Sequence, residues 1–370
     1  MIPRLGSITI HQVPPEGWLL ERLAACDAEY PAVLRRFLTG SPLRRQCMAL
    51  LMARLDPQNP CDLADRLRPL IEDTDWPNRS PTEIISHVML HRRVRDIMRT
   101  LYPDALGLVR TLAKLSDPLS VHEYGTLTAL HTEPQHRPRI AALRHLPDIQ
   151  RYAIPIILAL PAPYISLPVL RRLTSLEQAE DLARGIELIK RINPGVTDDA
   201  LRISLEASLP STTIRHWTKR WLERATEFWM AVPSVNSSEM IVLRSAAAMR
   251  DAARRFQNCL ECKIEECALG RAIYIEGRSP ACLIELECLS DGWVFRSIHG
   301  EKNSSVDPAT TRTVLKKLHG CGVQIPSRHW QAARFNRVAR LARILDPFRD
   351  QADLIDNELI DLGQGIPNAA

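Results

Sequence analysis

The chain has 370 residues, 45% of them hydrophobic and 25% charged, a composition typical of globular proteins that argues against a disordered or membrane protein. This length suggests two domains of ordinary size. The formal net charge of +5 permits a nucleic-acid partner without requiring one. The 27 prolines against 15 glycines favour short helices that end at proline, so we expect a mainly helical chain.

The first residues and the cysteines bear on the compartment of the protein. Met1 to Leu5 and the residues that follow lack the basic run and the apolar stretch of a secretory signal. Nine cysteines without a secretory context indicate reduced thiols rather than a disulfide framework. We therefore expect a cytoplasmic protein.

Residues 1–232 are predicted to form a helical N-terminal region with proline-rich joints. Ser80-Pro81-Thr82-Glu83 is a helix start signal, with Ser at the N-cap and Glu three residues later, and predicts a helix that continues to Leu101. The segment from Tyr152 to Leu170 is uncharged and almost long enough to cross a membrane. Its four prolines break the helical ladder that lipid requires, so we expect a buried helix pair and no membrane contact.

A helix is predicted from about Ser211 to Met230. Its apolar stripe contains Trp217, Trp221, Ala225 and Phe228, and basic residues lie off this stripe: Arg215, Lys219, Arg220 and Arg224. Such a pattern indicates either an amphipathic helix that buries its tryptophans, which we favour, or a surface where rings stack on bases and guanidinium groups meet phosphates.

The turn-forming run at positions 233–238 is the predicted linker to a second domain, residues 239–345. Ser245 is expected to cap one helix, and a second helical piece runs from Cys259 to Gly270. The period then falls to two, which predicts strands at 272–275, 281–289 and 293–299. Asp307-Pro308 starts a further helix. The predicted fold class is thus mainly α, with a C-terminal α+β module in which helices pack on a small antiparallel sheet.

A basic helix is predicted at the end of this module, followed by an acidic tail at residues 346–370. Between positions 328 and 345 the helix contains no acidic residue. Because clustered arginines supply most of the affinity for a phosphate backbone, its arginines are the nucleic-acid-binding candidates: Arg328, Arg334, Arg337, Arg340 and Arg343.

Most cysteines lie in the second domain. Cys259-x-x-Cys262 has the spacing of half a zinc site, but no second close pair follows, so we expect mostly buried thiols and no metal. His87 and His91 are interpreted as packing histidines. An alternative is a reactive Cys259 with His299 as its base. Neither a dinucleotide-binding glycine motif nor a phosphate loop is present, so no cofactor is predicted.

The run from Leu243 to Asn303 resembles the PcfJ-like domain of conjugative plasmids and other mobile elements. The resemblance depends on the order of elements and on five motif residues that we expect to converge on one concavity: Asn258, Cys259, Gly270, Gly300 and Asn303. Asn258, Lys263 and Ser297 stand where the family usually has His, Tyr and Gln. The resemblance implies an accessory factor in DNA processing.

Three functions follow from these patterns. The first is an accessory nucleic-acid-associated protein of a mobile genetic element, with DNA or DNA-processing proteins as partners. The second is a protein-interaction module built on the helical N-terminal region. The third is a cysteine-dependent enzyme with Cys259, His299 and Asn303 as candidate catalytic residues.

Overall fold

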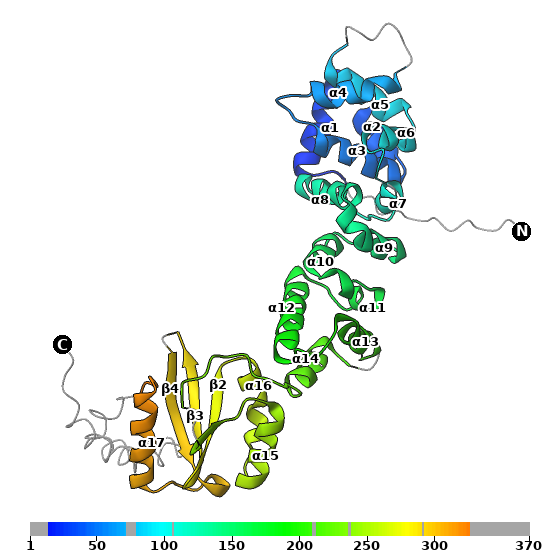
Figure 1. Ribbon diagram of the computed structural model, residues 1–370. Helices are drawn as coiled ribbons and strands as arrows, with labels where there is room; N and C mark the ends of the chain where they lie inside the picture. Colours follow the sequence, from blue (N-terminus) through cyan, green and yellow to red (C-terminus); the bar gives the residue numbers. More distant parts are fainter. Residues whose placement is uncertain are drawn as a thin grey trace, which may run out of the picture. The chain divides into compact units, whose positions relative to one another are not determined.

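The computed structural model describes residues 14–71, 79–105, 107–208, 212–235, 238–290 and 292–325 (Figure 1). Its chain divides into two compact units, residues 1–183 and 184–370, and the division falls within helix α12 (Leu176–Ile192). The predicted fold class is confirmed, since helices dominate and a small antiparallel sheet packed with helices follows the helical region.

The first unit is helical throughout its described residues. Helix α3 is central to its core, because every side chain from Gln46 to Met52 is buried. Within this core the Tyr124 hydroxyl donates a hydrogen bond of 2.5 Å to Oε1 of Gln46, which satisfies two polar groups far from water. The helices are α1 (Gly17–Glu29), α2 (Val33–Thr39), α3 (Pro42–Arg54), α4 (Cys61–Leu67), α5 (Pro81–His91), α6 (Val94–Leu101), α7 (Leu108–Leu112), α8 (Val121–Thr132), α9 (Arg137–His145), α10 (Ala153–Ala159) and α11 (Leu167–Leu170).

Proline ends or starts helices where the sequence predicts it. The uncharged segment after Tyr152 forms the two short helices α10 and α11, with Ile154, Ile156 and Ile157 buried, as expected. Among the described residues, no helix combines the length and the apolar character that crossing a membrane would need.

The helix predicted from Ser80 to Leu101 is in fact two helices, α5 and α6. Arg92 and Arg93 between them are extended. The Arg44 guanidinium donates hydrogen bonds to the backbone oxygens of Met89 (3.2 Å) and Arg92 (2.6 Å). These bonds supply partners for carbonyl groups that the interrupted helix leaves open, so the break is stabilised by a side chain from α3.

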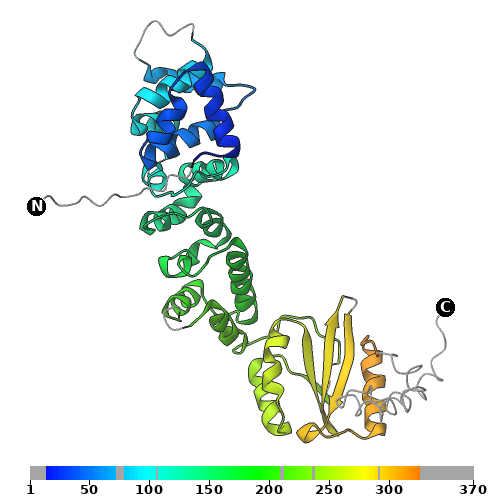
Figure 2. The same ribbon diagram turned by 180° about the vertical axis from the view of Figure 1, so that it is seen from behind.

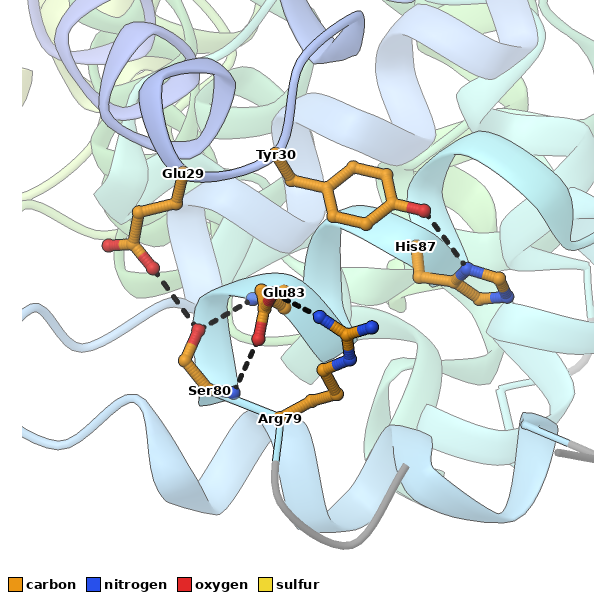
Figure 3. Close-up of polar contacts among 6 residues, drawn as sticks. All are labelled: Glu29, Tyr30, Arg79, Ser80, Glu83 and His87. Carbon is orange, nitrogen blue, oxygen red and sulfur yellow. Dashed lines mark hydrogen bonds and ion pairs between the residues drawn. The ribbon is translucent and has the colours of Figure 1, made fainter. Parts of the chain in front are cut away.

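Helix α5 begins with a complete capping box (Figure 3). Ser80 Oγ accepts a hydrogen bond of 3.1 Å from the amide of Glu83, and Glu83 Oε2 accepts one of 2.8 Å from the amide of Ser80. Ser80 Oγ also donates to Glu29 at the end of α1 (3.1 Å), which ties two helices together.

Replacing Ser80 with alanine removes the two bonds of its hydroxyl, with the Glu83 amide and with Glu29, and leaves the bond from the backbone amide of residue 80 to Glu83. We expect a loss of about 1 kcal/mol in the free energy of unfolding of the first unit, since N-cap replacements by alanine cost about 0.5–2 kcal/mol. Urea denaturation followed by circular dichroism measures it. Thr39→Ala is the control, because this exposed hydroxyl only donates to a carbonyl of its own helix. Equal stability of the Ser80→Ala variant and the control would contradict the capping role.

The second unit contains a four-stranded antiparallel sheet in the order β1-β2-β3-β4, with helices on both faces. Figures 1 and 2 show α15 and α17 on opposite faces of the sheet. The elements are α13 (Asp198–Ser208), α14 (Ile214–Leu222), β1 (Met240–Val242), α15 (Ala246–Phe256), η4 (Leu260–Lys263), α16 (Ile264–Ala268), β2 (Ala272–Arg278), β3 (Ala281–Leu289), β4 (Gly292–His299), η5 (Glu301–Asn303) and α17 (Pro308–Gly320).

Two apolar cores fill the space on either side of the sheet. Tyr274 and Leu283 face the core formed with α15 and α16, whereas Ile284 and Phe295 face the core formed with α17. The predicted face of β3 is confirmed, since Cys282, Ile284, Leu286 and Cys288 all lie on the α17 side.

The predicted boundary after residue 232 lies inside the second unit. Helix α14 ends at Leu222 rather than near Met230, because the following backbone bonds to other segments: the amides of Thr226 and Glu227 donate to Ile192, and that of Phe228 donates to Arg244. Phe228 and Val235 are buried in the cores of the α+β module. Val235, a residue of the predicted linker, therefore packs as part of this module.

The register of β4 differs from the predicted alternation. Leu286 pairs with Phe295 and Glu285 with Ser297, so Arg296 is an extra residue, a β-bulge. Ser297 and His299 were expected on the face of Trp293 and Phe295. The bulge places them instead on the face of Glu285, because one inserted residue reverses the side of every position beyond it.

Candidate nucleic-acid interface

A cleft of about 330 Å³ lies between helices α13 and α14. This volume is in the range of small ligand pockets. Three small residues of α13 and four long residues of α14 and its end line it: Ser204, Ala207, Ser208, Trp217, Arg220, Trp221 and Arg224. Aromatic rings and guanidinium groups thus share one concave surface.

One hydroxyl organises the two tryptophans. Ser204 Oγ accepts hydrogen bonds from the indole Nε1 of Trp217 (3.1 Å) and of Trp221 (3.3 Å). The rings stand 6.5 Å apart at an interplanar angle of 64°, an edge-to-face pair. Trp217 is 1% exposed and belongs to the core, whereas Trp221 is only half-buried. Trp221 is therefore the ring available to a ligand.

The two arginines stand at the edge of the cleft. Arg220 and Arg224 are four residues apart along the chain, and both are exposed. Neither forms an ion pair with any residue that the structure describes. Nearby Lys219 differs, since its Nζ lies 3.0 Å from Glu265 Oε1. The free guanidinium groups can therefore donate to an external anion, which they bind well through charge-assisted bonds.

The sequence identifies the basic and aromatic residues of this surface but not its second wall. The second wall consists of small residues of α13, which leave room for the cleft next to Trp221. Their spacing, at positions 204, 207 and 208, puts them on one face of a helix and is the signal that could have indicated this wall.

Two predicted elements lie outside the described residues. They are the acidic tail at 346–370 and the basic helix with its five candidate arginines, Arg328, Arg334, Arg337, Arg340 and Arg343.

A second polar group of residues lies on the α15 side of the sheet. Tyr274, Glu285 and Ser297 occupy paired positions on β2, β3 and β4. Ser297 Oγ donates to Glu285 Oε2 at 3.0 Å, and Arg296 Nε lies 3.6 Å from Oε1. Burial and the adjacent Glu285 carboxylate raise the pKa of Tyr274. We call these residues, together with His299, the sheet polar centre.

His299 belongs to the sheet polar centre because of the bulge. Burial lowers the pKa of His299, and the charge of Glu285 offsets only part of this effect. The imidazole is therefore neutral at pH 7 and retains one acceptor nitrogen. Its Nδ1 is buried without a hydrogen-bond partner among the described residues. The sheet polar centre thus offers acceptor groups to a donor.

The five motif residues do not all meet. Gly270 comes just before β2, at the end of the sheet where the Cys288 amide donates to the Arg271 carbonyl. Gly300 comes just after β4, at the opposite end of the sheet, where His299 pairs with Leu283. The expectation of a single concavity is wrong for these two glycines.

The other motif residues lie in turns next to α15. Asn258 Oδ1 accepts from the amide of Leu260 (3.1 Å), Cys259 precedes η4, and Asn303 ends η5, while α15 contacts both η4 and η5. Gly300 donates its amide to the Ser304 carbonyl at 2.8 Å. A Cβ on Gly300 would lie 2.6 Å from Ser304 Oγ, so a larger residue here would require the Ser304 hydroxyl to rotate away.

The thiol of the candidate catalytic cysteine has no hydrogen-bond partner among the described residues. Cys259 is exposed, and no hydrogen bond joins it to His299 or Asn303 there. The expectation of mostly buried thiols in the module is also wrong: Cys267 and Cys282 are buried, but Cys259 and Cys262 are exposed, and Cys288 and Cys321 are intermediate. Cys267 lies in the core on the α15 side, and this burial raises its pKa and so favours the unreactive neutral thiol.

The histidine pair of α5 is engaged in packing. His87 Nδ1 lies 3.4 Å from the Tyr30 hydroxyl (Figure 3), and the rings of His87 and His91 are 4.6 Å apart. Across the described residues, no group of three or more His, Cys, Asp or Glu side chains is placed to hold a metal ion.

Comparison of the chain with family models, with curated proteins and with solved structures finds no match.

Proposed function

We propose that this chain is a nucleic-acid-associated protein and that the cleft between α13 and α14 contacts the nucleic acid. The observation that carries the proposal is the combination of a half-exposed Trp221 with Arg220 and Arg224, which lack carboxylate partners in the described part of the chain. Rings that stack on bases beside guanidinium groups that bind phosphates are the usual elements of such surfaces.

The lining of the cleft favours an anionic partner. None of the side chains that line it is acidic, and Arg220 and Arg224 bring two cationic guanidinium groups to it. Like charges held four residues apart on a helix repel each other slightly, so an external anion would relieve this repulsion. A polyphosphate backbone supplies anions at the required density.

The accessory role in a mobile genetic element is the narrower part of the proposal. It depends on the resemblance of Leu243 to Asn303 to the PcfJ-like domain and implies that the partner nucleic acid is DNA. A cysteine-dependent enzyme gains no support from the surroundings of Cys259, whose exposed thiol forms no hydrogen bond with the described residues.

Fluorescence anisotropy with labelled oligonucleotides tests the proposal. We expect the Arg220→Gln, Arg224→Gln variant to bind at least about tenfold more weakly than the parent chain, the loss that corresponds to about 1.4 kcal/mol. The slope of log affinity against log salt should also fall by about one for each arginine that contacts a phosphate.

Arg254→Gln is the matched control for this experiment, because Arg254 is an exposed helical arginine of the same unit that pairs with Asp251 and does not line the cleft. Equal losses in the control and in the double variant would reject the cleft as the contact surface. Binding that ignores salt, or no binding at all, would reject the nucleic-acid function and favour a protein-interaction module.

A further inference from the structure

The cleft contains a hydrogen-bond donor in addition to its arginines. Ser204 Oγ uses its two lone pairs to accept the indole N–H groups of Trp217 and Trp221. Its own hydrogen has no acceptor among the residues that the structure describes, although serines within helices often donate to their own helix. The hydroxyl therefore remains able to donate to a group that enters the cleft.

The donor and the ring lie deeper than the charges. Ser204 and Trp221 are both partly buried, with the Ser204 hydroxyl bonded to the tryptophan nitrogens, whereas Arg220 and Arg224 are exposed at the rim. Ala207 faces them with a single methyl group, which leaves the space opposite the ring open. A flat ring with polar edges and an attached phosphate matches this order from interior to rim.

We infer that the cleft accepts one unpaired base of a single-stranded nucleic acid, stacked against Trp221, with its flanking phosphates on Arg220 and Arg224. The inference rests on the proposed function and narrows it to a strand class. In a duplex the bases are stacked and paired, so their faces cannot reach a ring that lies inside a cleft. The rim arginines alone could still touch duplex phosphates, but weakly.

Ser204 adds a contact to the edge of the base or to the sugar. Base carbonyl oxygens, ring nitrogens and ribose oxygens are all acceptors, so one hydroxyl donor does not select a sequence by itself. Binding is therefore expected to tolerate different sequences, as is usual where stacking and phosphate contacts dominate.

A variant that fills the cleft distinguishes insertion of a base from binding of phosphates at the rim alone. Ala207 is exposed on α13, so Ala207→Leu adds bulk opposite Trp221 without removing a contact or disfavouring the helix. We expect the affinity for a single-stranded oligonucleotide to fall at least about fivefold, the lower end of the loss when one stacked base is removed. Affinity for a blunt duplex of the same sequence should not change. Ala247→Leu, at an exposed position of α15 outside the cleft, is the control.

The outcomes distinguish the two levels of the proposal. If single strand and duplex bind equally and Ala207→Leu changes neither, the inference is overturned while nucleic-acid association stands. If neither strand form binds the parent chain, the proposed function fails first. Adenosine monophosphate is the third probe, and binding as tight as that of the oligonucleotide would overturn the strand assignment in favour of a free nucleotide.

Discussion

Replacing Trp217 with alanine is expected to lower the free energy of unfolding of the second unit by about 3–5 kcal/mol, the usual cost of truncating a buried aromatic residue. The ring is 1% exposed, and its indole nitrogen donates to Ser204 at 3.1 Å. The variant loses the apolar contacts of the ring, leaves a cavity between α13 and α14, and removes one of the two bonds that orient Ser204.

Amide hydrogen exchange measures this effect locally. Peptides from α13 and α14 should exchange faster in Trp217→Ala, while peptides from α3 in the first unit serve as an internal reference. Ile203→Ala is the control on α13, because Ile203 is 57% exposed and its truncation should stay within about 0.5 kcal/mol of the parent. Similar exchange in both variants would show that Trp217 does not hold the helix pair together.

Replacing Gly270 with alanine is expected to cost about 2–5 kcal/mol. Gly270 ends the turn after α16 with φ +74°, a left-handed conformation that costs a residue with a Cβ about 1–2 kcal/mol. The new Cβ would lie 2.7 Å from Cγ of Met230 and 2.9 Å from the ring of Trp229, so both side chains must move, at a cost typical of overpacking, about 1–3 kcal/mol.

Gly320→Ala is the matched control for that variant. Gly320 lies at the end of α17, and a Cβ there meets nothing within 4 Å. Alanine should leave stability unchanged or raise it by up to about 1 kcal/mol, because it restricts the unfolded chain. Chemical denaturation of both variants checks the pair. Equal stabilities would mean that the segment around Met230 adapts freely and that the glycine is not required.

Ser297 and Lys263, two positions at which the sequence departs from the PcfJ-like pattern that we propose it resembles, both contact carboxylates in the α+β module. Ser297 donates directly to Glu285, and Lys263 pairs with Glu266 of α16 at 3.1 Å. Substitution of Ser297 or Lys263 therefore changes a polar contact with a carboxylate and leaves the apolar cores intact.

Local signals in the sequence determined where three helices begin. Ser80, Ser245 and Asp307 cap α5, α15 and α17 as predicted, because a short polar side chain satisfies the free amides of a first helical turn whatever surrounds it. The period-two pattern likewise identified the buried face of β3, since alternation along a strand is a property of the backbone itself.

Tertiary contacts decided the features that create the candidate sites. Helix α14 stops at Leu222 because the amides of Thr226 and Phe228 bond to Ile192 and Arg244, partners distant in sequence. The bulge at Arg296 places His299 beside Glu285, and a bulge depends on how two strands pair rather than on one strand. The cleft forms because α13 packs beside α14, where Ser204 accepts hydrogen bonds from Trp217 and Trp221. Hydrogen bonds between distant segments produce no repeating pattern in the sequence. The sequence alone therefore identified Trp221 and Arg224 as candidates but did not show that they line one cleft.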